Sequence, residues 1–194
     1  MSTTSSTSHA ARLGEEVTEG HFEQTLTADD FKEAFRNHPA GVSVVTADPG
    51  DGPVGLTATS VFSVSAAPPL LVFSLSGRSS SAPALRRADT VVVHLLGADQ
   101  IGLAKTFSTT GIDRFADSSI WTRLVTGEPV LPAANAWLRG RIVNQMEAGD
   151  STVVAVQVLQ VKIPDAESRP AGQSHPLVYH NRTWHQLSDG SVMP

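Results

Sequence analysis

Short runs of alternating apolar and hydroxyl residues dominate the middle of the chain. The alternation is clearest in GVSVVTA from Gly41, in VGLTATSVFSVS from Val54 and in PPLLVFSLS from Pro68. Alternation over about four to eight residues predicts strands, and glycine- and proline-rich turns between such runs predict antiparallel pairs.

Similar runs continue to the end of the chain. TVVVHLL from Thr90 predicts another strand, residues 136–145 and 152–162 predict two more around the turn EAGDS, and LVYH and TWHQL predict a hairpin around Asn181-Arg182. With six to eight strands joined mostly by turns, the pattern predicts a mainly β protein. Its expected form is an antiparallel β-barrel, closed or nearly closed, with short helices at its ends.

Three short helices interrupt the strands. Thr27 and Asp30 form a capping pair at the start of the first, which Pro39 ends. Pro83 opens the second, and Asp99 is expected to cap the third, which runs to Phe107. The serine- and threonine-rich residues 1–25 predict a disordered tail, so residues 26–190 are expected to form the single domain.

Composition narrows the possible functions. The 194 residues carry 14 Lys and Arg against 19 Asp and Glu, and a net charge of −5 argues against nucleic-acid binding through a basic face. The chain has no cysteine, which excludes disulfides, thiolate metal sites and a cysteine nucleophile. No apolar run is long enough to span a membrane and the first residues lack a secretory apolar segment, so a cytoplasmic location is expected.

One motif is misleading. Residues 50–55 match the glycine pattern G-x-G-x-x-G, but the dinucleotide fingerprint requires a helix to open directly after it. Here the chain continues as a strand, and Pro53 removes an amide donor, so a glycine-rich hairpin turn is the better interpretation.

Two segments carry candidate chemistry. Residues 74–83 leave a strand with hydroxyls, Gly77 and Arg78, and then enter a helix, so they could bind a phosphate or simply cap that helix. Residues 55–65 alternate small hydroxyl side chains, which could let a flat ligand approach the backbone or could face solvent. A planar heterocycle with a phosphate tail would satisfy both segments.

At this point the sequence resembles the flavin reductase-like family, the split-barrel enzymes that bind FMN and reduce flavin with a nicotinamide cofactor. Seven segments carry the resemblance in chain order: Phe35-Arg36 with residues 39–46; 55–60; 63–65 with 68–72; 74–81; 91–96 with Gln100, Leu103-Ala104 and Phe107; 113–115; and 127–131 with Gly149-Asp150 and 176–179. The resemblance implies a Greek-key-like split barrel that forms a homodimer, with each flavin at the interface between protomers.

The family's flavin contacts carry over to eleven positions of this chain. The isoalloxazine contacts fall on Thr57, Ala58, Thr59 and Ser60, the phosphate and ribityl contacts on Ser74, Ser76, Ser79, Ser80 and Ser81, and the later loop adds Phe107 and Arg114. No side chain is expected to be catalytic, because flavin accepts the hydride itself. No metal site is expected either, since His175, His180 and His185 are five residues apart and match no helix face.

The turn Gly149-Asp150-Ser151 departs from the family, whose members commonly carry histidine at the last position, near the nicotinamide. The leading prediction is an NAD(P)H-dependent reductase of FMN or FAD that supplies a partner monooxygenase. The missing histidine leaves open an FMN-binding electron-transfer or carrier protein without NAD(P)H oxidation. A barrel-shaped scaffold without flavin is the third interpretation.

Overall fold

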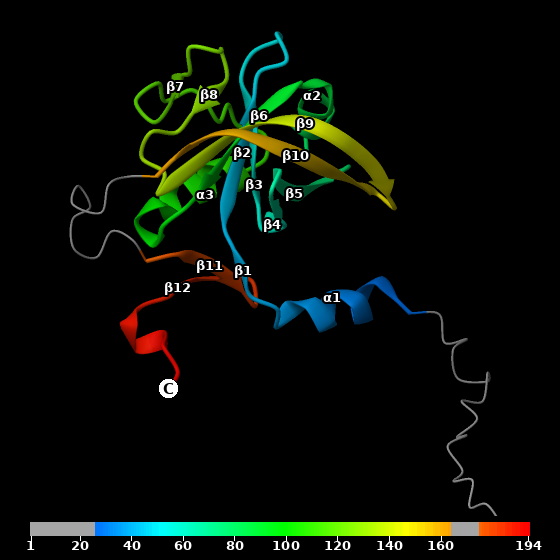
Figure 1. Ribbon diagram of the computed structural model, residues 1–194. Coiled ribbons are helices and arrows are strands. Elements are labelled where there is room, and N and C mark those ends of the chain that lie inside the picture. Colours follow the sequence, from blue (N-terminus) through cyan, green and yellow to red (C-terminus); the bar gives the residue numbers. More distant parts are fainter. Residues whose placement is uncertain (1–25, 164–174) are drawn as a thin grey trace, which may run out of the picture. The chain divides into compact units, whose positions relative to one another are not determined.

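The computed structural model describes residues 26–163 and 175–194 (Figure 1). The chain divides into two compact units, Met1–Phe35 and Arg36–Pro194. The predicted tail, residues 1–25, lies outside the described residues. Helix α1 (Ala28–Arg36) begins with the predicted capping pair, in which the Asp30 N–H donates to the Thr27 hydroxyl and the Thr27 N–H donates to the Asp30 carboxylate, each at 3.1 Å.

Seven strands of the second unit form one antiparallel sheet in the order β3–β2–β6–β9–β10–β5–β4 (Figure 1). They are β2 (Ser43–Ala47), β3 (Val54–Ala58), β4 (Phe62–Ala66), β5 (Pro69–Ser76), β6 (Thr90–Leu95), β9 (Ala136–Ala148) and β10 (Ser151–Lys162). The mainly β, antiparallel fold predicted from the sequence is therefore confirmed.

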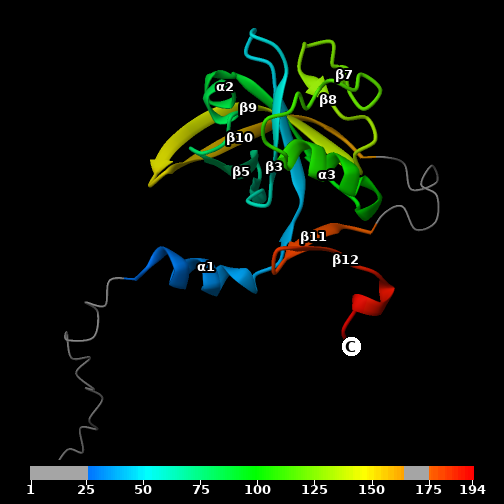
Figure 2. The ribbon, with the colours of Figure 1, turned by 180° about the vertical axis from the view of Figure 1, so that it is seen from behind.

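The sheet curls because β9 and β10 are long and curved and because register shifts interrupt their pairing (Figure 2). Apolar side chains, among them Phe73, Leu75 and Val154, are buried on its inner face. Among the described strands, no ladder joins the two edges β3 and β4. The split-barrel description stays a prediction.

The run from Gly55 to Ser65, predicted as one strand, is two strands with a corner between them. At that corner the Ser60 hydroxyl accepts the backbone N–H of Ser74 at 2.9 Å. The hydroxyl thus takes the place of a backbone partner near the end of β5. Before the corner the chain pairs with β2 as strand β3, and after it the chain pairs with β5 as strand β4.

A smaller sheet joins β1 (Ala40–Gly41), β11 (Leu177–His180) and β12 (Thr183–Gln186). Between β11 and β12, Asn181 and Arg182 have φ of 48° and 61°, as a two-residue hairpin turn requires. The predicted hairpin is therefore confirmed. Within the described parts of the chain, no helix has the length and apolarity that crossing a bilayer requires.

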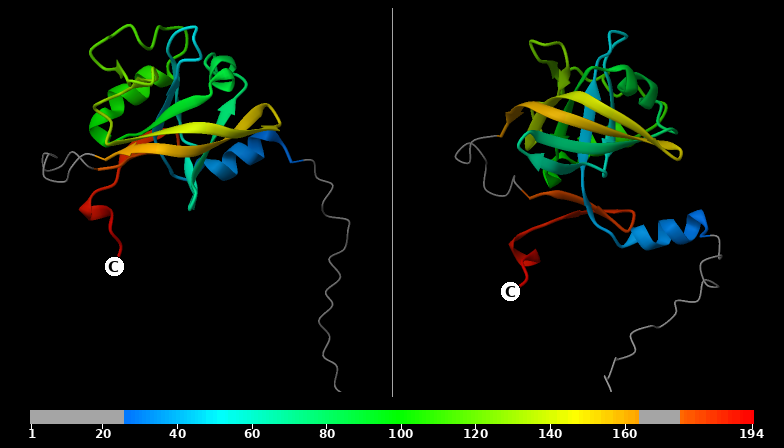
Figure 3. Two further views of the ribbon diagram at one scale, coloured as in Figure 1. Left: turned by 45° about the horizontal axis from the view of Figure 1, so that its top comes forward. Right: turned by 45° about the vertical axis from the view of Figure 1, so that its right-hand side comes forward.

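Helices α2 (Ala82–Arg87) and α3 (Ile101–Ser108) both contact β2 and β3 (Figure 3). Asp99 does not cap α3 as expected. A 3₁₀ turn (Ala98–Gln100) precedes the helix, and there the Gln100 side-chain oxygen accepts the Gly97 N–H at 2.8 Å. Beyond α3, the short strands β7 (Thr122–Arg123) and β8 (Pro129–Val130) pair within the long connection to β9.

Candidate functional site

A cavity of about 420 Å³, here called the β3 cavity, lies where β3, β5 and α3 end. It brings together nine of the eleven predicted flavin contacts: Thr57, Ala58, Thr59, Ser60, Ser74, Ser76, Ser79, Phe107 and Arg114. Leu56, Arg78, Ser108 and Thr110 complete the lining. Ser108 and Thr110 were missed, although the hydroxyl run directly after Phe107 could have indicated them.

The chemistry of this lining favours an anion. Of the described residues, eight hydroxyl side chains and two guanidinium groups surround the β3 cavity, and no carboxylate is among those that line it. Hydroxyls donate hydrogen bonds to phosphate oxygens, and arginine adds permanent charge. A phosphorylated ligand therefore meets donors here, and the Asp150 carboxylate, 3.8 Å from the Arg78 Nε, lies outside the lining.

The backbone of β3 adds a second kind of donor. β3 is an edge strand that pairs only with β2 in the main sheet, so one row of its backbone groups points away from the ladder. The Gly55 carbonyl belongs to this outer row, because it accepts from Ser81 at 2.8 Å and from Arg114 at 3.1 Å. The backbone groups of successive residues point to opposite sides of a strand, so the N–H and C=O of Thr57 also point outward. On that side they can form hydrogen bonds with the edge of a planar ring.

Arg114 is held rigidly beside the β3 cavity. Its Nε and Nη2 donate to the Thr109 carbonyl at 3.1 and 2.9 Å, and its Nη1 donates to the Gly55 carbonyl and, at 2.7 Å, to the Ser81 hydroxyl. Burial lowers the pKa of Arg114, but a guanidinium stays protonated in proteins. None of these acceptors is a carboxylate, so no ion pair within the described part of the chain neutralises its positive charge.

Ser80 and Ser81 lie outside the cavity lining. Ser80 is exposed, whereas Ser81 is buried with its hydroxyl used between Gly55 and Arg114. In the preceding loop the N–H of Gly77 donates to the Asp150 carbonyl and that of Ser79 to the Ser76 carbonyl. Because the loop uses its own amides in this way, hydroxyls and arginines are the main anion donors.

Ser151, the residue expected on the nicotinamide side, begins β10 opposite Ser76 of β5. It therefore lies beside the β3 cavity without lining it. Its hydroxyl donates to the neighbouring Asp150 carboxylate at 3.2 Å.

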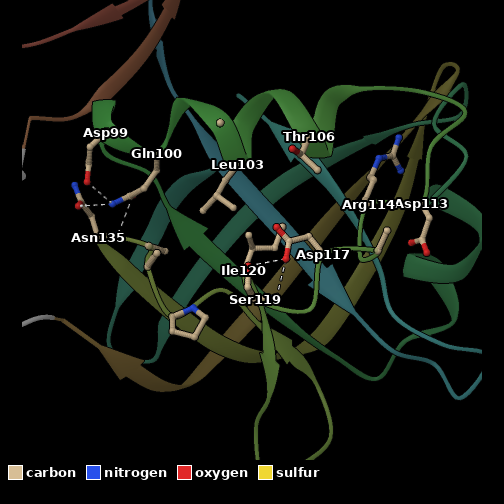
Figure 4. Close-up of a pocket in the computed structure, with 15 residues that line it drawn as sticks. Asp99, Gln100, Leu103, Thr106, Asp113, Arg114, Asp117, Ser119, Ile120 and Asn135 are labelled. Atoms are coloured by element: carbon tan, nitrogen blue, oxygen red, sulfur yellow. Dashed lines mark hydrogen bonds between the residues drawn. The ribbon is translucent and has the colours of Figure 1, made fainter.

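A second, larger cavity of about 920 Å³, here called the α3 cavity, lies between α3 and the loops that follow it (Figure 4). Its lining includes the carboxylates of Asp99, Asp113 and Asp117, and Arg114 is the only basic residue that the described part of the chain contributes to it. Three carboxylates make it a poor site for the flavin phosphate despite its size. No sequence motif indicated this cavity, because residues 99–135 meet only through the fold.

Fold and β3 cavity together define a protein that can hold a phosphorylated planar ligand at the edge of an antiparallel sheet. A family model described as "Flavin reductase like domain" matches residues 35–188, and the chain belongs to this family. The family predicted from the sequence is thereby confirmed.

Comparison with individual proteins leads to the same family. The chain is 44% identical over 161 residues to an NADH:FMN oxidoreductase of Rhodococcus qingshengii, covering 83% of this chain and 82% of the relative. It is 31% identical over 157 residues to the reductase component of a 4-nitrophenol 4-monooxygenase/4-nitrocatechol 2-monooxygenase of Rhodococcus opacus, covering 81% and 80%. Among solved structures, a flavin reductase domain protein from Arthrobacter sp. FB24 superposes with a TM-score of 0.76 at 34% identity, covering 84% of this chain and 96% of that one.

Proposed function

We propose that this chain is an NADH-dependent flavin reductase that reduces FMN. The observation that carries the proposal is the β3 cavity, in which hydroxyls, two arginines and an outward-facing strand edge meet, with no carboxylate among the described residues that line it. The Rhodococcus qingshengii relative, named an NADH:FMN oxidoreductase, supports this choice of nicotinamide and flavin. FAD and NADPH are the alternative substrates to be compared with them.

The residues around the β3 cavity contribute different interactions to flavin binding. Arg114 and Arg78 offset the charge of the flavin phosphate, and the hydroxyls of Ser76 and Ser79 donate hydrogen bonds to it. The outward-pointing backbone N–H and C=O groups of β3 form hydrogen bonds with the polar edge of the flavin ring. Phe107 is fully buried and gives the cavity a rigid apolar wall.

Flavin and nicotinamide supply the redox chemistry when bound, by passing a hydride from the nicotinamide to the flavin ring. The chain's contribution is to orient the two and to exclude water from between them. It needs no side-chain nucleophile or acid for this.

The direct test is steady-state oxidation of NADH by the purified protein with FMN, FAD or riboflavin added, repeated with NADPH. Oxidation that depends on added flavin supports the proposal. Tight FMN binding with no NADH or NADPH oxidation would replace it by the second candidate, an FMN-binding carrier or electron-transfer protein.

Ser151 is the observation that favours this second candidate, because the family commonly carries histidine there. A serine is shorter and uncharged, so we expect a raised KM for NADH rather than loss of the reaction. Ser151→His should lower the KM for NADH and leave the Kd for FMN unchanged. If neither protein oxidises NADH, the carrier function stands.

The proposal extends to assembly and partners. We infer a homodimer with the flavin at its interface, a partner monooxygenase that receives reduced flavin, and the cytoplasmic location expected from the sequence. The Rhodococcus opacus relative, a monooxygenase reductase component, supports the partner. Apolar side chains exposed on β4, β9 and β10 support the dimer: Phe62, Val64, Val143, Met146, Leu159 and Val161.

A further inference from the structure

The α3 cavity has no role in the flavin site proposed above, yet it has more than twice the volume of the β3 cavity. Its volume lies in the range typical of small-molecule sites. The lining has two chemical parts. One is apolar, with Leu103 on α3 and Ile120 and Ala133 on the loops, and the other consists of carboxylates and amides.

Arg114 connects the two cavities, because it lines both. Its four hydrogen bonds to Thr109, Gly55 and Ser81 fix the guanidinium and leave one of its five N–H groups without an acceptor among the described residues. A phosphate at Arg114 therefore stands at the junction between the β3 cavity and the α3 cavity.

Polar groups are spread along the α3 cavity from this junction. Arg114 and Asp113 lie at one end, and Asp99, Gln100 and Asn135 lie at the other (Figure 4). Asp117 lies between them, where one of its oxygens accepts both the N–H and the hydroxyl of Ser119, at 2.9 and 2.6 Å. The second oxygen of Asp117 has no hydrogen-bond partner among the described residues.

This arrangement matches a nucleoside phosphate better than a simple anion or cation. Carboxylates accept hydrogen bonds from ribose hydroxyls in dinucleotide sites. Leu103 and Ile120 offer apolar surface to a heterocycle. Gln100 is held by Gly97, Asp99 and Asn135, which leaves the side-chain N–H groups of Asn135 to donate to a ring nitrogen of adenine. The single cation at one end suits a phosphate at one end of the ligand.

We propose that the α3 cavity binds the adenosine end of an adenine dinucleotide whose phosphates lie at Arg114. This inference rests on the proposed function for its choice of ligand, since FAD and NADH are the dinucleotides of that reaction. Both carry the same adenosine group, so the experiment must separate them.

The first measurement is calorimetric titration of the protein with ADP-ribose, which contains neither flavin nor nicotinamide. Leu103→Trp fills the α3 cavity from the helix, and Ala133→Trp fills it from an exposed position on the opposite loop. Each should weaken ADP-ribose binding at least tenfold. Val125→Trp, on a fully exposed loop residue outside the cavity, is the matched control and should change nothing.

The second measurement identifies the source of the adenosine. If it belongs to FAD, Leu103→Trp and Ala133→Trp weaken FAD binding and leave FMN binding unchanged. If it belongs to NADH, the two variants raise the KM for NADH but not for reduced nicotinamide mononucleotide.

The outcomes separate this inference from the proposed function. A wild-type protein that oxidises NADH with FMN but does not bind ADP-ribose overturns the inference alone. The inference is also overturned if Leu103→Trp and Ala133→Trp, the two variants that fill the cavity, bind ADP-ribose as tightly as the wild type. The third outcome is a wild-type protein that binds ADP-ribose but never oxidises NADH, with binding lost in both filled variants. It supports the α3 cavity as the adenosine site and overturns the proposed reductase function.

Discussion

Single side chains in this protein act through backbone groups more often than through one another. Ser81 and Arg114 both donate to the Gly55 carbonyl, so a serine and an arginine far apart in the chain hold the edge strand β3 in place. His94 does the same in the core. Its Nδ1–H donates to the Val44 carbonyl and its Nε2 accepts the Leu131 N–H, both at 3.0 Å.

At the β3 cavity, where the flavin phosphate is proposed to bind, we predict that Ser76→Ala with Ser79→Ala weakens FMN binding well over tenfold. Each hydrogen bond to a charged group contributes about 1.5–3 kcal/mol. Riboflavin lacks the phosphate, so its affinity should barely change. Fluorescence titration measures both ligands, and Ser80→Ala, at an exposed position outside the cavity, is the control. Equal losses for FMN and riboflavin would contradict the phosphate assignment.

His94 makes folding stability depend on pH. Burial lowers its pKa to about 4, and the hydrogen bond to the Val44 carbonyl only partly offsets this. In the unfolded chain the same imidazole titrates near 6.5, so the unfolded state binds the extra proton between about pH 6.5 and 4. Stability from this group is therefore complete above pH 6.5 and falls by about 3 kcal/mol as the pH drops to 4.

Urea unfolding at pH 7, 5.5 and 4 measures this loss. His94→Gln should be less stable at pH 7 and should have a flatter profile between pH 6.5 and 4. Glu128 affects folding stability at lower pH than His94 does. Burial raises its pKa, but hydrogen bonds led by the one from Arg139 outweigh that effect and lower it to about 2. A wild-type profile that is flat down to pH 4.5 would refute the role of His94.

At the scale of elements, close contact between β3 and α3 sets the shape of the β3 cavity. A Cβ on Gly55 would lie 2.7 Å from the ring of Phe107 and 3.1 Å from the Thr46 methyl. Only glycine lets the helix approach this strand. The same contact places the outer edge of β3, the Phe107 ring and Arg114 around one cavity.

We predict that Gly55→Ala lowers the free energy of unfolding by about 1–3 kcal/mol, because the buried Phe107 ring has no room to move. Gly102→Ala is the matched control inside α3, where no atom outside its chain neighbours and its own helix backbone lies within 4 Å of the new Cβ. It should raise stability by about 0.5–1 kcal/mol, since alanine favours a helix over glycine. Urea unfolding compares the two, and a Gly55→Ala protein as stable as the wild type would rule out the steric account.

At the scale of the molecule, the described strands leave unusual apolar surface in contact with solvent. Phe62 and Val64 on the edge strand β4 are 59% and 55% exposed, and Met146 on β9 is 58% exposed. Clusters of exposed apolar residues and bare sheet edges mark interaction surfaces. A second copy of the chain is the occupant we propose.

We therefore predict that the wild type has twice the 20.5 kDa mass of one chain by light scattering after size exclusion. Phe62→Ser with Val64→Ser should shift it to the mass of one chain and weaken FMN binding as well, because the flavin is proposed to lie at the interface. Val125→Ser removes a fully exposed apolar residue elsewhere and should leave the dimer intact. A wild type that runs as a single chain would exclude the dimer.

The sequence by itself determined the features that depend on neighbours within a few residues. The cap formed by Thr27 and Asp30 and the hairpin turn at Asn181-Arg182 were correct because a cap and a two-residue turn are local hydrogen-bonding problems. The family motifs also indicated most of the residues that line the β3 cavity, because these lie in short contiguous segments.

Only the tertiary structure decided what depends on distant segments. The strand expected from residue 55 to 65 breaks because the Ser60 hydroxyl pairs with Ser74, fourteen residues away. The Ser81 hydroxyl lies outside the β3 cavity, between Gly55 and Arg114, and the α3 cavity exists only where α3 meets the loops beyond it. Alternation and turn chemistry describe a residue's neighbours along the chain, whereas burial and hydrogen-bond partners across the fold depend on which surfaces pack together.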